Sequence, residues 1–248
     1  MNIKRYIIIL FLKPFFILGN TDSLNFIPNN SFDKIKKCVY EDVEFKYIDN
    51  WFIPNASTPD YFLKCRKGIL GYSIPFNNDL GYQESFDKDG YVGIYVFSSS
   101  VRHSVKNYRE YVEVKLKDTL EIGSKYIISA YFSLADTSVY AVTPISFGFT
   151  KDIYKNEESI YPNIPIDSLY GYVDIVDSFI TDKINWVKCE KIYVAKGGES
   201  YLIIGNFRKD CESKTKKLSK TGTRNKSILS YYYIDNISII RHWNYLLK

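Results

Sequence analysis

The chain has 248 residues, of which 46% are hydrophobic, 17% aromatic and 25% charged, and its formal net charge is +5. A chain of this length can fold as one large β domain or as two small ones, and we favour one because β-sandwiches often reach this size. Tyr and Phe are abundant and Met occurs once. Because helix-forming Ala and Leu are scarce, the composition argues against a helical protein and predicts an all-β fold.

Residues 1–22 are predicted to be a signal peptide. The segment begins with the basic residues Lys4 and Arg5 and continues as an apolar run with few interruptions. It is too short and too interrupted for a good membrane span, and it matches a secretory leader that is cleaved near residues 19–23. We therefore expect residues 23–248 to form a single β-sandwich domain that is secreted, periplasmic or on the outer cell surface. A retained N-terminal anchor is the alternative, and no later apolar stretch is long enough to cross a bilayer.

Part of the positive charge belongs to this leader. Residues 1–20 contain three of the 33 basic residues and none of the 28 acidic ones, so the remaining chain has a formal charge of only +2. Binding to nucleic acid needs a concentrated basic surface, and we do not expect it here. One basic run remains among Ser, Thr, Gly and Asn, where a solvated loop is the simpler interpretation. It consists of Lys214, Lys216, Lys217, Lys220, Arg224 and Lys226.

Alternating apolar and polar residues predict many short strands. The longest apolar face comes from residues 108–136, where two alternating runs are joined by a short polar link, and we expect this pair to form the centre of the fold. Residues 34–80 and 150–185 lack a sustained period and are expected to be irregular connections. Further strands are predicted at residues 26–33 (an edge strand), 91–97, 145–149 and 231–239, with a hairpin of 186–194 and 201–207 around Gly197 and Gly198. Short strands separated by turn signals indicate a β-sandwich or jelly roll.

Four cysteines follow the leader, namely Cys38, Cys65, Cys189 and Cys211. In an exported chain an even count suggests two disulfides, and four cysteines allow three connectivities. We prefer Cys38 with Cys65, which would staple the long irregular segment, and Cys189 with Cys211, which flank the predicted hairpin. Zinc is less favoured, because no close pair of cysteines exists and the two histidines are isolated.

Eight motifs occur in the order found in a known family. They are NNSFD at 29–33, TPDYF at 58–62, GYQES at 81–85, DGYVGIYVF at 89–97, YREYVEVKL at 108–116, YIISAYFSLAD at 126–136, GGESYLIIGNF at 197–207 and YYYIDNISI at 231–239. Together they resemble the jelly-roll domain of secreted and surface proteins of gliding-type Gram-negative bacteria, often found with OmpA-type domains. They are more distantly similar to galactose-binding-domain-like carbohydrate-binding modules. The resemblance implies a jelly-roll β-sandwich.

Asp235 is predicted to be buried. By strand parity it shares a face with Tyr233, Ile237 and Ile239, and an unpaired carboxylate there is unfavourable. In the modules that the chain resembles, the corresponding acid helps to hold a structural calcium ion, and oxygen ligands suit calcium. The alternative is that Asp235 pairs with a basic side chain or caps a turn through hydrogen bonds. The calcium site that the resemblance implies consists of Asp33, Asp87, Asp89, Gly90 and Asp235.

The irregular segments combine aromatic rings with acids and amides. Ring faces stack on pyranose rings, and acids and amides bind sugar hydroxyls, so these segments suit a carbohydrate site. Packing in the core is the competing explanation for each aromatic ring. The predicted ligand-binding residues are Trp51, Asp60, Tyr61, Tyr82, Gln83, Glu84, Arg109, Asp136 and Tyr140.

No motif indicates catalysis. Acids are available in Asp60, Glu84, Glu110 and Asp136, but they form no tight cluster in the sequence of the kind that a glycoside hydrolase needs. A serine hydrolase would require a nucleophile elbow near a histidine, and none is present. We therefore predict a non-catalytic binding module for a glycan or another cell-surface ligand. The alternatives are a structural or adhesive envelope protein with a protein partner and, third, a glycoside hydrolase.

Overall fold

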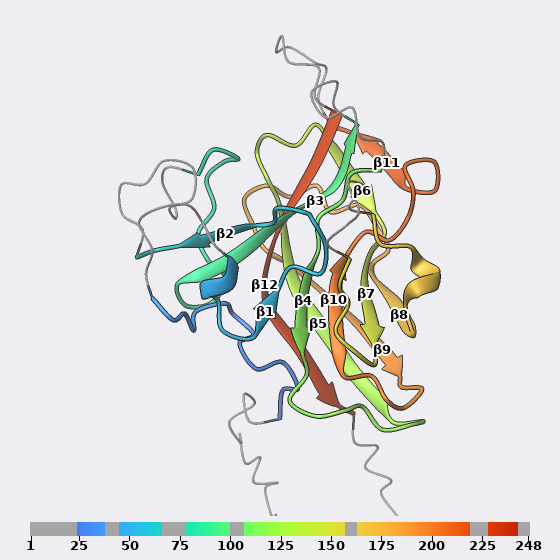
Figure 1. The fold of residues 1–248 in the computed structure, drawn as a ribbon. Coiled ribbons are helices and arrows are strands. Elements are labelled where there is room, and N and C mark those ends of the chain that lie inside the picture. The colour runs from blue at the N-terminus through green and yellow to red at the C-terminus, as the bar shows by residue number, and fades with distance from the viewer. Residues whose placement is uncertain are drawn as a thin grey trace, which may run out of the picture.

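The computed structural model describes residues 24–37, 45–65, 78–99, 107–156, 163–218 and 228–242. Two five-stranded sheets face each other in a jelly-roll β-sandwich, and a two-stranded ribbon lies beside them (Figure 1). The predicted all-β, jelly-roll fold class is confirmed. None of the helices in these described ranges is long and apolar enough to cross a membrane.

The first sheet has the strand order β1–β4–β10–β7–β8, and all of its pairs are antiparallel. Its strands are β1 (Trp51–Phe52), β4 (Val112–Lys115), β10 (Tyr201–Gly205), β7 (Ile145–Thr150) and β8 (Gly171–Val176). The short helix η2 (Phe45–Tyr47) precedes β1, and η3 (Ile166–Ser168) precedes β8.

The second sheet has the order β2–β3–β12–β5–β9 and is also antiparallel throughout. Its strands are β2 (Asp60–Leu63), β3 (Gly90–Ser99), β12 (Ile228–Arg241), β5 (Lys125–Leu134) and β9 (Val187–Val194). The ribbon pairs β6 (Tyr140–Thr143) with β11 (Lys214–Lys217). The core between the sheets takes alternate residues of both, for example Val114 and Leu202 from the first sheet and Ile128 and Ile234 from the second.

The second sheet also buries part of its outer face. Phe62, Tyr91, Tyr231 and Tyr233 form a second apolar cluster there, separate from the core between the sheets. Gly93 makes room for it, because a Cβ atom at this position would lie 2.2 Å from the Tyr231 hydroxyl oxygen. A sheet with one buried and one solvated face would show polar residues at these positions. The outer face must therefore be covered by other segments of the chain.

Most of the predicted strands are present, and the predicted irregular regions contain more. Residues 91–97, 145–149 and 231–239 lie in β3, β7 and β12. The segment 26–33 forms turns rather than an edge strand, although the Phe26 N–H still donates to the Ile239 carbonyl at 2.9 Å. Strands β1 and β2 lie within residues 34–80, and β8 lies within 150–185. The basic run begins as strand β11, whose side chains are all exposed.

The predicted hairpin of residues 186–194 and 201–207 is wrong. Strand β9 lies at the edge of the second sheet beside β5, whereas β10 lies inside the first sheet between β4 and β7. The glycine turn therefore carries the chain from one sheet to the other. The two runs of residues 108–136 behave in the same way, because β4 belongs to the first sheet and β5 to the second.

The pairing of Cys189 with Cys211 is therefore also wrong. Both cysteines are free: Cys189 lies in the middle of β9, and Cys211 lies in the turn that follows β10. Without a hairpin, nothing brings the two positions together. Cys38 lies outside the described residues, so its pairing with Cys65 stays a prediction.

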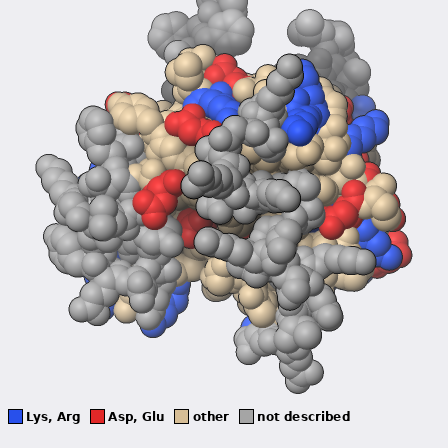
Figure 2. All heavy atoms as spheres, turned by 90° about the horizontal axis from the view of Figure 1, so that it is seen from above, with Lys and Arg blue, Asp and Glu red and all other residues tan. Residues whose placement is uncertain are grey.

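Charged side chains are mixed on the surface. Figure 2 shows one face of the molecule, on which the coloured Lys and Arg side chains alternate with Asp and Glu. The side chains that are coloured in this view form no continuous basic area.

The two free thiols should differ in reactivity. Burial raises the pKa of Cys189 to about 11, which lowers its thiolate fraction at neutral pH, whereas Cys211 is exposed. We expect a maleimide to label Cys211 rapidly and Cys189 slowly in the native protein without reductant, and both rapidly after unfolding. Mass spectrometry of the labelled peptides measures this. A Cys211→Ser variant should retain only the slow site, and a Cys189–Cys211 disulfide peptide would contradict the structure.

Candidate functional site

A groove of about 520 Å³ lies on the surface between the loop at residues 82–86 and the turn at residues 183–186. Residues from both segments line it, together with Asp136, which follows the end of β5. The lining residues are Tyr82, Gln83, Glu84, Ser85, Phe86, Asp136, Lys183, Ile184, Asn185 and Trp186. The groove thus combines three aromatic rings with acids, amides and one lysine.

The loop at residues 82–86 is held by buried polar contacts. Asp235 accepts hydrogen bonds from the backbone N–H groups of Phe86 at 2.9 Å and Asp87 at 3.0 Å. The side chain of Gln83 is buried, and its Oε1 accepts from the Ser133 hydroxyl at 3.0 Å. The Tyr91 hydroxyl donates to the Gln83 carbonyl at 3.1 Å. These contacts fix the loop over the outer face of the second sheet.

Asp136 lines the groove just after the end of β5. Its Oδ2 accepts from the Tyr82 N–H at 3.0 Å. Gly81 has φ +146°, and a Cβ atom there would lie 2.6 Å from Asp136 Oδ2, so the close approach requires glycine. The Nζ of Lys183 donates to the carbonyls of Asp136 at 2.7 Å and Ser138 at 2.8 Å. Both walls of the groove are therefore joined to the end of β5.

The aromatic rings of the groove are partly exposed and rigidly held. Phe86 stacks on Tyr131 with a centroid distance of 3.6 Å. The indole N–H of Trp186 donates to the Glu84 carbonyl at 2.9 Å, and its ring meets that of Tyr91 edge to face at 5.6 Å. Tyr82 is 51% exposed and donates its hydroxyl to Glu84 Oε1 at 3.1 Å. Ring faces fixed in this way lose little freedom when a ligand binds.

Four of the nine predicted ligand-binding residues lie together in this groove. They are Tyr82, Gln83, Glu84 and Asp136. Trp51 is buried against Phe32 and donates its indole N–H to the Asn29 carbonyl at 2.8 Å. Tyr61 is also buried and donates to the Phe32 carbonyl at 2.5 Å. The positions of Trp51 and Tyr61 favour core packing, the competing explanation, over contact with a ligand.

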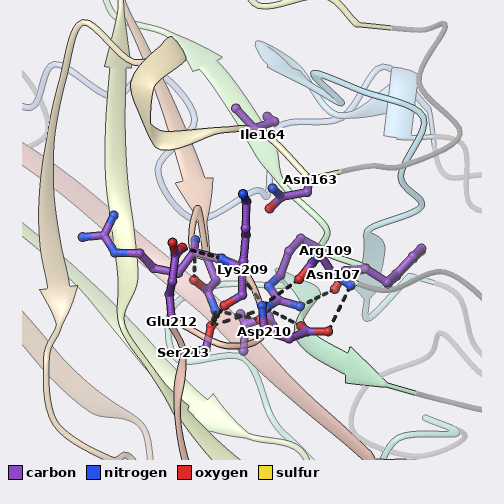
Figure 3. Close-up of polar contacts among 12 residues, drawn as sticks. Asn107, Arg109, Asn163, Ile164, Lys209, Asp210, Glu212 and Ser213 are labelled. Carbon is purple, nitrogen blue, oxygen red and sulfur yellow. Dashed lines mark hydrogen bonds and ion pairs between the residues drawn. The ribbon is translucent and has the colours of Figure 1, made fainter.

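Arg109 is buried in a structural network rather than in the groove (Figure 3). Its guanidinium pairs with Asp210 at 2.8 Å and donates to the carbonyls of Tyr108 and Arg208. Asn107 and Asp210 exchange two further hydrogen bonds, of 3.0 and 2.7 Å. The network ties the segment before β4 to the loop after β10. Tyr140 lies elsewhere, in β6 opposite Lys217.

Asp60, which is half-buried, and Glu110, which is buried, form an acidic pair on the outer side of the second sheet. Asp60 accepts from the Tyr231 hydroxyl at 2.7 Å. Glu110 accepts from the Tyr108 hydroxyl at 2.9 Å, the Thr58 hydroxyl at 3.1 Å and the Tyr95 N–H at 2.9 Å. Burial raises the pKa of Asp60 to about 6 and that of Glu110 to about 8, and the negative charge of Asp60 also raises the pKa of Glu110. The pair therefore binds protons near neutral pH.

Asp235 is buried as predicted, but on the other face of β12. Register shifts between Asp235 and Ser238, and Asn236 adopts φ +47°, so the alternation reverses within the strand. Ile237 and Ile239 point into the core, whereas Asp235 lies under the loop at residues 85–87. The predicted shared face of Asp235 with Ile237 and Ile239 is wrong because of this bulge.

The predicted calcium ligands gather around the same loop, but most have other partners. Asp87 accepts from the Ser31 hydroxyl at 2.7 Å, and Asp89 pairs with Lys64 at 3.3 Å. Asp33 lies 3.6 Å from Lys88 Nζ, and Gly90 adjoins the Phe32 carbonyl. Over the described ranges, no group of three or more His, Cys, Asp or Glu side chains is placed to hold a metal ion. The contacts of Asp235 match the hydrogen-bonded alternative, and calcium binding stays a prediction.

The sequence did not indicate a binding role for six of the ten lining residues, namely Ser85, Phe86, Lys183, Ile184, Asn185 and Trp186. Trp186 was expected in a strand, and the other five had no predicted role in binding. The only local signal was Trp186 itself, because a large aromatic residue between a turn and a strand is a common contact residue. The turn at 183–186 is distant in sequence from residues 82–86, so only the fold brings them together.

No protein-family model matches the sequence, and no curated protein matches it. Several solved structures are similar in fold. The CBM22-1 xylan-binding domain of Xyn10C from Paenibacillus barcinonensis aligns with 86% of this chain and 91% of its own, at 11% identity and a TM-score of 0.41. A CBM4 structure aligns with 87% and 99%, at 12% identity and a TM-score of 0.37.

A third similar structure is an adhesin domain. The K2 cleaved adhesin domain of Lys-gingipain aligns with 88% of this chain and 98% of its own, at 10% identity and a TM-score of 0.37. Identities and TM-scores of this size carry no inference about function. What the groove binds has to be argued from its own residues.

The acidic pair should make stability depend on pH. A carboxyl whose pKa is raised in the folded state contributes stability below its unfolded pKa, here 4.5 for Glu110, and loses it as pH rises through about 8. We expect Glu110→Gln to gain stability relative to the wild type between about pH 5 and pH 8. Glutamine can accept from the Tyr95 N–H and donate to the hydroxyls of Tyr108 and Thr58. Urea unfolding at several pH values measures the difference, and parallel curves for the two proteins would refute it.

Asp235 should be essential for the loop. Asp235→Ala leaves the amides of Phe86 and Asp87 without their acceptor, and we expect it to lower the free energy of unfolding by about 2 kcal/mol or more. Asp235→Asn keeps one acceptor oxygen and should cost less. Thermal melts of the wild type and the two variants measure these differences. Melts of the wild type with and without a chelator test the calcium prediction, because a chelator lowers the Tm only if calcium stabilises the fold. An Asp235→Ala protein as stable as the wild type would contradict this account of the loop.

Proposed function

We propose that this protein is a non-catalytic glycan-binding module and that the groove between residues 82–86 and 183–186 is its binding site. The observation that carries the proposal is the convergence of Tyr82, Phe86 and Trp186 with exposed acids and an amide in one preformed groove. Sugar sites combine a flat apolar surface with a few hydrogen-bonding groups around it. The proposal rests on this groove and not on the similarity to carbohydrate-binding modules.

The size and stiffness of the groove support this proposal. Its volume of about 520 Å³ falls in the range of roughly 300–1,000 Å³ that is usual for small-ligand sites. The loop is fixed by Asp235, Gln83 and Asp136, so little of the binding free energy is needed to order it. A glycan can therefore bind without rearranging the backbone.

The buried acids do not suggest a hydrolase. Glycoside hydrolysis needs two carboxyl groups that face each other across a substrate. Glu110 is about 1% exposed, and its two oxygens already accept three hydrogen bonds from Tyr108, Thr58 and Tyr95. Asp60 is engaged by Tyr231. The contacts of this pair are those of a structural element, and neither residue lines the groove.

An adhesive or structural envelope protein is the second candidate. Aromatic-rich grooves also occur at protein interfaces. Ile184 lines the groove and is 82% exposed, and an exposed apolar side chain of this kind favours a protein partner over a sugar. We propose a secreted or cell-surface location for either function, because the leader at residues 1–22 suits export.

A glycan array tests the proposed site. We expect the wild type to bind a defined set of glycans, and Tyr82→Ala to weaken that binding by about ten-fold, as for an aromatic hot spot. Tyr82 is half exposed, so its removal should leave the fold intact. Trp186→Ala should also lower the stability of the fold, because Trp186 packs on Tyr91.

Tyr172→Ala is the matched control. Tyr172 is a tyrosine of similar exposure, 45%, but it lies in β8 of the first sheet. Circular dichroism and thermal melts should show that all variants are folded. An empty array with a clean interaction with a surface protein would favour the adhesive function. Equal loss of glycan binding in Tyr172→Ala and Tyr82→Ala would place the site elsewhere.

A further inference from the structure

The groove contains two exposed carboxylates whose oxygens are only partly used. Glu84 accepts from the Tyr82 hydroxyl through Oε1, and Asp136 accepts from the Tyr82 N–H through Oδ2. Both side chains are exposed. A carboxylate can accept several hydrogen bonds, so the second oxygen of each is able to accept from a ligand. The hydrogen bond to Glu84 raises the pKa of Tyr82, in keeping with a negative charge beside the phenol.

The one lysine among the lining residues, Lys183, donates hydrogen bonds to backbone carbonyls. The Nζ of Lys183 donates to the carbonyls of Asp136 and Ser138 at 2.7 and 2.8 Å. Two of its three N–H groups are therefore used, and burial lowers its pKa. The positive charge of Lys183 is partly offset by these carbonyls, whereas Glu84 and Asp136 are exposed carboxylates that line the groove. The groove is thus better suited to a positive charge than to a negative one.

Three aromatic rings surround the same space. Tyr82 and Phe86 are 51% and 40% exposed, and Trp186 comes from the turn at residues 183–186. The face of an aromatic ring carries negative potential and attracts ammonium groups. Rings and carboxylates therefore favour the same kind of ligand, which has an apolar face that can stack on an aromatic ring and a positively charged group beside it.

We propose that the groove binds glycans that carry a free amino group, with the ammonium between the carboxylates of Glu84 and Asp136 and the sugar ring against the aromatic residues. This inference rests on the proposed glycan-binding function and adds the ligand class. Neutral sugars lack the ion pair with the carboxylates and bind more weakly. Sugars with carboxylate groups meet two like charges and bind least.

Calorimetry with four oligosaccharides of equal length and linkage tests the ligand class. The oligosaccharides are built from glucosamine, N-acetylglucosamine, glucose or glucuronic acid. We expect glucosamine to bind about two- to five-fold tighter than N-acetylglucosamine, as for an exposed ion pair or cation–π contact. This advantage should shrink as salt is added, because the charges are exposed to solvent. Glucuronic acid should bind most weakly.

Two variants assign the effect to the carboxylates. Glu84→Gln and Asp136→Asn keep the shape and one acceptor oxygen, and each should reduce the ratio of glucosamine affinity to N-acetylglucosamine affinity by about two-fold or more. Asp167→Asn changes the net charge equally at an exposed acid in η3, and it should alter nothing. Tyr82→Ala should weaken binding of all four oligosaccharides.

The outcomes separate this inference from the proposed function. Binding of glucuronic acid as tight as that of glucosamine, or a glucosamine advantage that persists in both carboxylate variants, would overturn the ligand class and leave the glycan site in place. The same loss of advantage in Asp167→Asn would show only a net-charge effect and would also overturn it. If none of the oligosaccharides binds and the glycan array is empty, both proposals fail.

Discussion

The carboxylate of Asp235 accepts the backbone N–H groups of Phe86 and Asp87 at 2.9 and 3.0 Å, and the rest of the outer face depends on this contact. Strand β12 carries aromatic side chains on both faces, so the outer face of the second sheet cannot be left in water. The segment that covers it has no regular structure and needs specific acceptors for its amides. Asp235 supplies one because it shares the outer face with Tyr231 and Tyr233, and the bulge that follows at Asn236 returns Ile237 to the core.

The groove is a consequence of how this face is covered. The loop that covers Tyr91 and Tyr233 carries Tyr82, Glu84 and Phe86 on its solvent side, and the turn before β9 adds Trp186. Because Trp186 contacts both the groove and the outer apolar cluster, the binding surface and the stability of the fold share residues. A rigid groove of this kind suits recognition of a rigid ligand such as a glycan.

Two buried polar clusters fix the segments around the groove in different ways. Arg109 and Asp210 form an ion pair that also satisfies backbone carbonyls, which gives a buried charge the partners it needs (Figure 3). Asp60 and Glu110 are two like charges with hydroxyl partners, and the fold accommodates them by raising their pKa values. The second cluster therefore makes the stability of the fold depend on proton binding.

The sequence by itself determined the all-β class and most strand positions, because the alternation of apolar and polar residues along a strand is a local property. It also placed Tyr82, Gln83, Glu84 and Asp136 among the ligand-binding candidates, because aromatic rings, acids and amides are the groups that contact a sugar. Only the tertiary structure decided which strands pair, so the expected β9–β10 hairpin and the Cys189–Cys211 disulfide were wrong. Only the tertiary structure, too, showed that Trp186 joins the groove and that Asp235 faces outward. Strand pairing and bulges depend on packing between residues far apart in the chain, and no local pattern encodes that packing.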